Sequence, residues 1–228
     1  MDSVKAWRAG VLQAMPIMLG DIPVGFAYGV LAQKAGISVF NTLLMSIVVY
    51  AGSSQLIAVG LISAGIPAVS IILTTFVVNL RHMLMSAALS PYLQGWRKPA
   101  LAAFAFELTD ETFAVHSTRM SRADSHKQET FAINITAQAA WVLGSWLGIV
   151  AGNSIAEIEP LALDYALPAM FIALLVMQIK KWDQIGVAAL SGLLSVVFVQ
   201  LGLDQWYVIA ATLIGATTGV MVGRWMKN

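Results

Sequence analysis

Residues 67–92 read PAVSIILTTFVVNLRHMLMSAALSPY, an apolar stretch that contains a single charged side chain, Arg81. A helix needs about 20 apolar residues to cross the hydrocarbon core of a bilayer, so this stretch predicts a transmembrane helix. A lone arginine facing lipid would be too costly, and Arg81 must therefore meet a carboxylate or line a cavity. The stretch predicts a membrane protein with a polar interior.

The composition of the whole chain agrees with that prediction. Of its 228 residues, 58% are hydrophobic and only 11% are charged, whereas soluble domains carry about 25% charged residues. A net charge of +1 without long basic runs gives no basis for nucleic-acid binding. The chain has no cysteine and no phosphate-cradling loop, zinc-protease or serine-hydrolase motif. We therefore predict no enzyme activity, no cofactor and no metal site.

The same length rule predicts an all-α polytopic membrane protein with about eight transmembrane helices, in a single transporter domain over residues 1–228. Seven helices would result if one of the two short last spans did not cross. The first span is expected to be retained, because Pro16, Asp21 and Pro23 do not fit the apolar core of a signal peptide. The predicted spans are 11–32, 39–63, 67–92, 99–118, 130–151, 161–179, 184–201 and 206–223.

Lysine and arginine are distributed unevenly between the two sides of this topology. With the N-terminus inside, nine of them lie on the cytoplasmic side, and three lie outside, namely Lys34, Arg97 and Lys98. Positive charge marks the cytoplasmic side of a membrane. Both termini are therefore predicted to be cytoplasmic.

The first and last thirds of the chain resemble each other weakly. Residues 14–19 (AMPIML) and 166–171 (ALPAMF) share an apolar pattern around a proline. Five spans precede the second copy, so spans 1–3 and 6–8 would form an inverted repeat. Such repeats are common in transporters, where substrates bind at broken helices near the bilayer midplane. Chance similarity between apolar segments is the alternative.

Several polar positions lie at a similar depth in the predicted spans. At 1.5 Å per residue, each falls about 17 to 20 Å from the near end of its span. That depth is close to the bilayer centre, where polar residues are usually functional. Asn79 and His82 share a helical face beside Arg81 and belong with them. The positions at this depth are Asp21, Gly52, Ser53, Ser54, Gln55, Arg81 and Asp110.

The first span has Pro16, Gly20 and Pro23 around Asp21. Proline removes an amide donor and glycine tolerates unusual backbone angles. We predict a helix break there, with Pro168 as its counterpart in the sixth span, and carbonyls freed to bind a ligand or an ion. A proline kink that only shapes packing is the alternative.

Glu107, Asp110 and Glu111 are spaced to lie on one face of the fourth predicted span. Asp110 is the acid nearest to Arg81 in depth, so these two are predicted to pair; an ion pair with a purely structural role is the alternative. One arginine cannot neutralise all the acids at this depth, and at least one of them should hold a proton. His82, Glu107 and Asp110 are therefore candidates for proton coupling.

Two further patterns predict helix packing. Glycines recur at every fourth position in residues 25–29, 144–148 and 215–223, which is typical of close helix contacts in membranes. A polar stripe along the fifth span favours hydrogen bonds between helices over a substrate wall. This stripe consists of Asn134, Gln138, Trp141 and Ser145.

Five stretches, in order along about three quarters of the chain, resemble the AzlC-type large subunit of branched-chain amino acid exporters. The resemblance implies export of leucine, isoleucine, valine and often methionine across the cytoplasmic (inner) membrane of a prokaryote. It also implies a small, separately encoded AzlD-type membrane partner. The stretches are Pro16-x-x-x-Gly20-x-x-Pro23-x-Gly25-x-x-Tyr28-Gly29, Tyr50-Ala51-Gly52-Ser53-Ser54-Gln55, Asn79-Leu80-Arg81-His82, Leu108-Thr109-Asp110-Glu111-x-Phe113-Ala114 and Leu167-Pro168-Ala169-Met170-Phe171.

The residues and the resemblance together predict a proton-coupled secondary transporter of apolar amino acids, embedded in the lipid bilayer. Arg81, with helix-end amides in residues 52–55, would bind the substrate carboxylate. Asp21 or Asp110 would bind the ammonium, and Phe26 and Phe171 would contact the side chain. The alternatives are a channel, a membrane enzyme that uses Asp110 with His82, and a scaffold subunit whose partner transports. A channel would repeat its ligands around a pore axis, and a scaffold would not need polar residues at the midplane.

Overall fold

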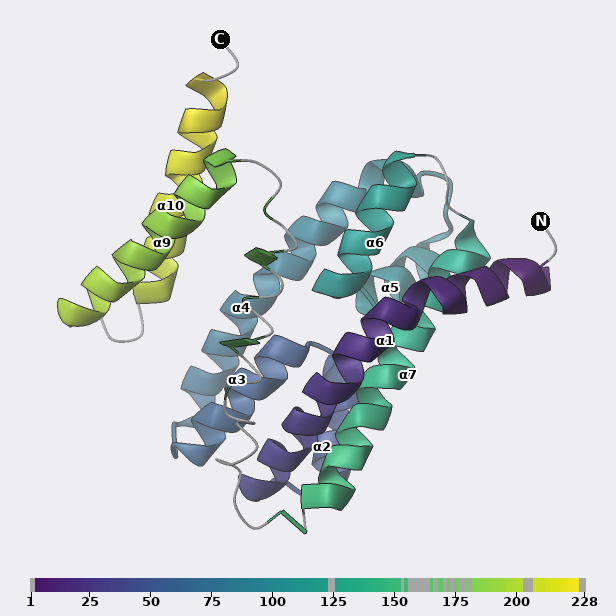
Figure 1. Cartoon of the computed structure of the whole chain (residues 1–228), viewed down its shortest axis with the longest axis horizontal. Coiled ribbons are helices and arrows are strands. Elements are labelled where there is room, and N and C mark those ends of the chain that lie inside the picture. The colour runs from purple at the N-terminus through teal and green to yellow at the C-terminus, as the bar shows by residue number, and fades with distance from the viewer. Residues whose placement is uncertain are drawn as a thin grey trace. The chain divides into compact units, whose positions relative to one another are not determined.

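The computed structural model describes residues 3–122, 126–152, 182–202 and 207–225, together with residues 154, 155, 165, 168, 169, 172, 175, 176 and 179. These residues form helices and short connections, with no strand among them (Figure 1). The chain divides into two compact units, Met1–Ile172 and Ala173–Asn228. The single domain over residues 1–228 stays a prediction.

The helices follow the predicted spans closely. The bounds match seven of the eight spans to within a few residues at most ends, although α1 starts earlier than predicted, and most of the span 161–179 lies outside the described residues. Unit 1 contains α1 (Ser3–Lys34), α2 (Val39–Leu44), the π-helix η1 (Met45–Val49), α3 (Gly52–Ser63), α4 (Ala68–Leu89), the 3-10 helix η2 (Ser90–Leu93), α5 (Lys98–Phe106), α6 (Asp110–Ser121) and α7 (Lys127–Gly152); unit 2 contains α9 (Trp182–Gln200) and α10 (Tyr207–Trp225).

Among the described residues, three segments are long and apolar enough to cross a membrane, namely Ser3–Lys34, Ala68–Leu93 and Lys127–Gly152. The helix α4 exposes a broad row of large apolar side chains, including Ile72, Phe76 and Met83. Such a surface suits contact with lipid rather than water. The all-α fold is confirmed, whereas the count of eight spans and the inverted repeat stay predictions.

The helices α1 and α7 lie side by side in unit 1 (Figure 1). A Cβ atom on Gly25 would lie 2.8 Å from the carbonyl oxygen of Trp141, and one on Gly144 would lie 2.5 Å from that of Ile22. Only glycine allows so close an approach of two backbones. Gly10 approaches Glu129 near the start of α7, and Gly25 approaches Trp141 further along it. The two helices are therefore parallel, as the first and fifth spans of an alternating topology must be. The close packing predicted for these glycine motifs is confirmed.

The helix break predicted in the first span is wrong. The helix α1 continues from Ser3 to Lys34 with Pro16 and Pro23 inside it. Each proline removes only one amide donor, the neighbouring turns keep their hydrogen bonds, and packing against α7 supports the helix. Gly20 faces open space. The alternative, prolines within a packed helix, is the correct one. Pro168 is an exposed helical position, and its surroundings lie outside the described residues.

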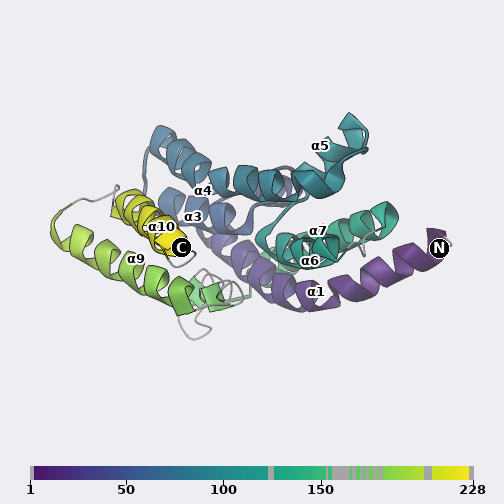
Figure 2. The same ribbon diagram turned by 90° about the horizontal axis from the view of Figure 1, so that it is seen from above.

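Two other spans are broken instead. Between η1 and α3 the chain passes through Tyr50, with φ +41°, and Ala51, with φ −136°. Between α5 and α6 it passes through residues 107–109. Seen from above, α4 and α5 lie on one side of unit 1 and α1 on the other, with α3, α6 and α7 between them (Figure 2). The breaks therefore place two helix N-termini, those of α3 and α6, in the interior of unit 1.

In unit 2, α9 and α10 form an antiparallel hairpin. A Cβ atom on Gly219 would lie 3.0 Å from Val187, and one on Gly215 would meet Ser191. Gly219, the later of the two glycines on α10, contacts Val187, the earlier of the two residues on α9. The two helices therefore run in opposite directions. These contacts confirm the predicted close packing at Gly215 and Gly219, the first two glycines of the motif in residues 215–223.

Candidate functional site

The first break turns the chain so that α3 begins in the interior. The left-handed backbone of Tyr50 ends η1, and the extended backbone of Ala51 starts α3 at Gly52. The first amides of a helix have no carbonyl partner within it, so they attract anions. Of the helix-end amides that the sequence placed at residues 52–55, the amide of Gln55 donates to the Ala51 carbonyl (2.9 Å), whereas Gly52, Ser53 and Ser54 occupy the first turn of α3. The Cβ of any larger residue at Gly52 would lie 2.8 Å from the indole of Trp141.

The second break is made by a helix cap. Thr109 accepts a hydrogen bond from the amide of Thr112 (3.3 Å), and the Thr112 hydroxyl accepts one from the amide of Thr109 (2.8 Å). This reciprocal cap starts α6 at Asp110, with Asp110 and Glu111 in its first turn, where the helix dipole favours acids. The shared helical face predicted for Glu107, Asp110 and Glu111 is thus wrong, because Glu107 ends α5. Thr109 followed by two acids is a capping signal readable in the sequence.

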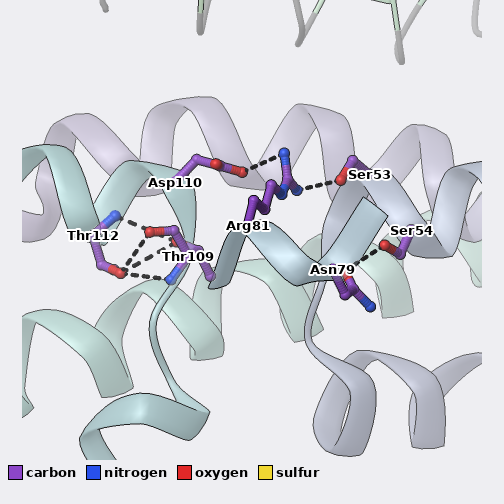
Figure 3. A network of polar contacts seen from close by, with 7 residues as sticks. All are labelled: Ser53, Ser54, Asn79, Arg81, Thr109, Asp110 and Thr112. Carbon is purple, nitrogen blue, oxygen red and sulfur yellow. Dashed lines mark hydrogen bonds and ion pairs between the residues drawn. The ribbon is translucent and has the colours of Figure 1, made fainter. Parts of the chain in front are cut away.

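Arg81 of α4 joins the two breaks (Figure 3). One guanidinium nitrogen lies 2.9 Å from Asp110 Oδ2, and another donates to the Ser53 hydroxyl. The predicted pairing of Arg81 with Asp110 is confirmed. The third nitrogen, Nε, is buried without a hydrogen-bond partner. We call Arg81, Asp110 and Ser53 the Arg81 cluster; it joins the first turn of α3 to the first turn of α6.

The neighbours of Arg81 on α4 have separate contacts. Asn79 accepts a hydrogen bond of 2.5 Å from the Ser54 hydroxyl of α3, as Figure 3 shows. His82 is partly buried and lies within electrostatic range of Arg81 and Asp110. The structure therefore brings five of the predicted site residues together at the α3–α4–α6 contact, with His82 beside them.

Three acids lie beyond the Arg81–Asp110 pair. Asp21 on α1 is 8% exposed, and it interacts electrostatically with Glu111 of α6. Glu107 has one carboxylate oxygen buried without a hydrogen-bond partner. The phenol of Tyr50 lies within electrostatic range of all three. Among the described residues, no three acidic or histidine side chains converge closely enough to hold a metal ion.

Gln55 is not part of this group. Its side chain is fully buried, accepts hydrogen bonds from the Trp141 indole (3.1 Å) and the Ala51 amide (3.3 Å), and donates to Ser46 (3.3 Å). Ser46 in turn shares a 2.8 Å hydrogen bond with Ser145. We call Gln55, Ser46, Trp141 and Ser145 the Gln55 network. It ties η1 and α3 to α7.

The polar stripe on α7 makes hydrogen bonds between helices, as favoured from the sequence. Trp141 and Ser145 belong to the Gln55 network, and Gln138 donates to the Ile47 carbonyl (3.0 Å). Asn134 shares a 2.7 Å hydrogen bond with His116 of α6. All four members of the stripe thus contact another helix, and none of them reaches Arg81.

A second ion pair was not predicted. Arg119 lies 2.7 Å from Glu129, and Gln13 donates to the other oxygen of Glu129 at 2.6 Å. This contact ties the start of α7 to α1 and α6. Arg119 lies in the last turn of α6 and Glu129 in the first turn of α7, where basic and acidic side chains are favoured. Both residues directly flank the predicted spans 99–118 and 130–151, so their position at helix ends was the available signal.

The arrangement offers two kinds of recognition close together. The guanidinium of Arg81 and the first amides of α3 suit an anion such as a carboxylate. The acids around Tyr50 suit a cation. The two are joined through α6, where Asp110 pairs with Arg81 and its neighbour Glu111 interacts with Asp21. A small zwitterion carries both kinds of charge.

Comparisons with known proteins identify a family for this chain. The sequence profile of the family described as AzlC protein matches residues 16–155. Over 219 residues the chain is 30% identical to the inner membrane protein YgaZ of Escherichia coli, across 93% of this chain and 87% of that protein. Over 213 residues it is 32% identical to an uncharacterized membrane protein of Archaeoglobus fulgidus, across 92% of each.

A third relative carries a functional name. The chain is 28% identical over 218 residues to the branched-chain amino acid transport protein AzlC of Bacillus subtilis, across 95% of this chain and 84% of that protein. No solved structure matches the chain. The matched residues 16–155 include both helix breaks and the Arg81 cluster. The resemblance noted from the five stretches is confirmed, and the chain belongs to the AzlC family of membrane proteins.

Proposed function

We propose that this protein is the large subunit of a two-component secondary transporter that exports branched-chain or other apolar amino acids from the cytoplasm. Membership of the AzlC family and the name of the Bacillus subtilis relative support a role in branched-chain amino acid transport. The substrates would be leucine, isoleucine, valine and methionine.

The observation that carries the proposal is the position of Arg81. It stands between two half-helix N-termini in the interior of unit 1, with Nε buried and unpartnered. A buried donor without a partner is expensive, and a substrate carboxylate is a natural acceptor for it. The free amides at the start of α3 would complete the carboxylate site. Phe26 on α1 would contact the apolar side chain.

Energy would come from the proton gradient. Glu107, Asp110 and His82 lie at or beside the second break, and Glu107 has an oxygen without a partner. A carboxyl group that binds a proton from outside and releases it inside would bias which way the cavity opens. No nucleotide-binding motif occurs in the chain, so a gradient is the economical driving force.

The partner would be a small AzlD-type membrane subunit, in the inner membrane with both termini of this chain in the cytoplasm. Reporter fusions at Asn228 test that topology. If only a reporter that works outside the cytoplasm is active at Asn228, the predicted topology is wrong. The inverted repeat of spans 1–3 and 6–8 would then be wrong as well.

The test of transport is efflux from cells preloaded with labelled leucine, valine, methionine or an unrelated solute. Efflux of the three amino acids should be fastest when both subunits are present, and Arg81→Ala should abolish the increase while Arg122→Ala, at the exposed end of α6, should not. Equal efflux with the partner alone would instead support the scaffold alternative. Non-saturable efflux of all four solutes would support a channel.

A further inference from the structure

Tyr50 is the one non-glycine residue with a positive φ among the described residues. Its side chain is 4% exposed, and its hydroxyl is buried without a hydrogen-bond partner. The left-handed backbone of Tyr50 ends η1, and its phenol lies within electrostatic range of Asp21, Glu111 and Glu107. A phenol hydroxyl both donates and accepts, so this one has unused hydrogen-bonding capacity within electrostatic range of these buried or partly buried acids.

Neither Asp21 nor Glu111 forms an ion pair in the described part of the chain. The ion pairs found there are Arg81–Asp110 and Arg119–Glu129. Arg81 forms its ion pair with Asp110 and also lies within electrostatic range of Glu111. One guanidinium therefore serves three acids, Asp21, Asp110 and Glu111, and cannot neutralise all of them. Burying a carboxylate without a partner is unfavourable, so a cation or a proton has to accompany this pair.

The position of Asp21 and Glu111 indicates which kind of cation would accompany them. Asp110 and Glu111 are consecutive residues in the first turn of α6; one holds the guanidinium that suits a carboxylate, and the other meets Asp21 and Tyr50. In an α-amino acid the carboxylate and the ammonium are attached to the same carbon. A site for such a substrate therefore needs its anionic and cationic halves close to each other, and both would be held at the first turn of α6, by Asp110 and Glu111.

We infer that Asp21, Glu111 and Tyr50 form the site for the substrate's ammonium group, and that this site makes the transporter select amino acids over the corresponding 2-oxo acids. The inference rests on the proposed function. The three ammonium hydrogens would be donated to the two carboxylates and the phenol oxygen. A 2-oxo acid has the same carboxylate and side chain but offers no donor, so it would leave the acids unpaired.

The test is exchange of labelled leucine in proteoliposomes that contain both subunits, with unlabelled leucine or 4-methyl-2-oxopentanoate as competitor. In the wild type, the oxo acid should compete at least about 100-fold more weakly than leucine, because it leaves buried polar groups unpaired. Tyr50→Phe keeps the ring and removes the hydroxyl, and should weaken competition by leucine about tenfold. Asp21→Asn and Glu111→Gln should weaken it more, and none of the three should weaken competition by the oxo acid. The matched control is Tyr92→Phe, at a half-exposed tyrosine in η2.

The outcomes separate this inference from the proposed function. No leucine exchange by the wild type would overturn the proposed function before the inference is reached. Normal exchange with the oxo acid as effective as leucine, or with a selectivity ratio that Tyr50→Phe and Glu111→Gln do not alter, would overturn the inference alone. Because Asp21→Asn could fail to fold on α1, circular dichroism and gel filtration accompany each variant, and Tyr50→Phe carries the test in that case.

Discussion

The Arg81 cluster and the Gln55 network each include a residue at the start of α3, Ser53 and Gln55, yet they differ in charge and in how far their polar groups are paired. The Gln55 network is neutral, and its carboxamide, indole and hydroxyl groups all have protein partners. The Arg81 cluster is charged and leaves a guanidinium nitrogen buried without a partner. A satisfied neutral network holds helices together, whereas an unsatisfied charged one is prepared to accept a ligand.

Arg81→Ala should have the largest effect. It removes the cation at both helix breaks and leaves Asp110 without a partner, so leucine exchange in proteoliposomes should fall about 100-fold or more. Arg81→Asp combined with Asp110→Arg should recover part of the membrane level lost in each single variant, because the ion pair is restored in reverse. Losses that simply add in the double variant would contradict direct pairing.

Glu107→Gln should separate exchange from coupling. The amide keeps the shape of the side chain but cannot carry a proton. Exchange without a gradient should persist, while acceleration by an imposed ΔpH should disappear; Asp110→Asn is the companion variant. Efflux by the wild type that is indifferent to both ΔpH and membrane potential would remove the basis for proton coupling.

Gln55→Ala should affect stability rather than affinity. It removes three hydrogen bonds between η1, α3 and α7, each worth about 0.6 kcal/mol in a membrane, for a loss of about 2 kcal/mol. Unfolding in detergent measures the loss, with Gln94→Ala at an exposed position as control. If Gln55→Ala is as stable as the wild type but leucine competes much more weakly, Gln55 belongs to the substrate site, as the sequence predicted. The Gln55 network and the Arg81 cluster would then not differ in function.

Ser54→Ala should have the smallest effect. The Ser54 hydroxyl makes one hydrogen bond, to Asn79, so unfolding in detergent should become easier by about 0.6 kcal/mol. Leucine exchange should change little. A loss as large as that of Gln55→Ala would show that this contact supports the α3–α4 pairing, not only one side chain.

Much of this protein follows from its sequence alone. Apolar length places seven of the predicted spans on helices, because a bilayer and a fully hydrogen-bonded backbone permit little else. Glycine spacing predicts the contact between α1 and α7 through the same requirement for close approach. The pairing of Arg81 with Asp110 follows from depth and charge, since a lone arginine in lipid leaves so few partners.

The tertiary structure decided where the helices break and which polar groups meet. Prolines broke nothing in α1, because packing against α7 supports a helix that has lost two amide donors. The real breaks lie at Tyr50–Ala51 and at residues 107–109, where long-range partners and a cap replace the missing helical hydrogen bonds. Gln55 stands three residues after Gly52 in one motif, but the partners on α7 take it away from Arg81. Local sequence sets the preference of each segment, and only contacts between distant helices determine which preference prevails.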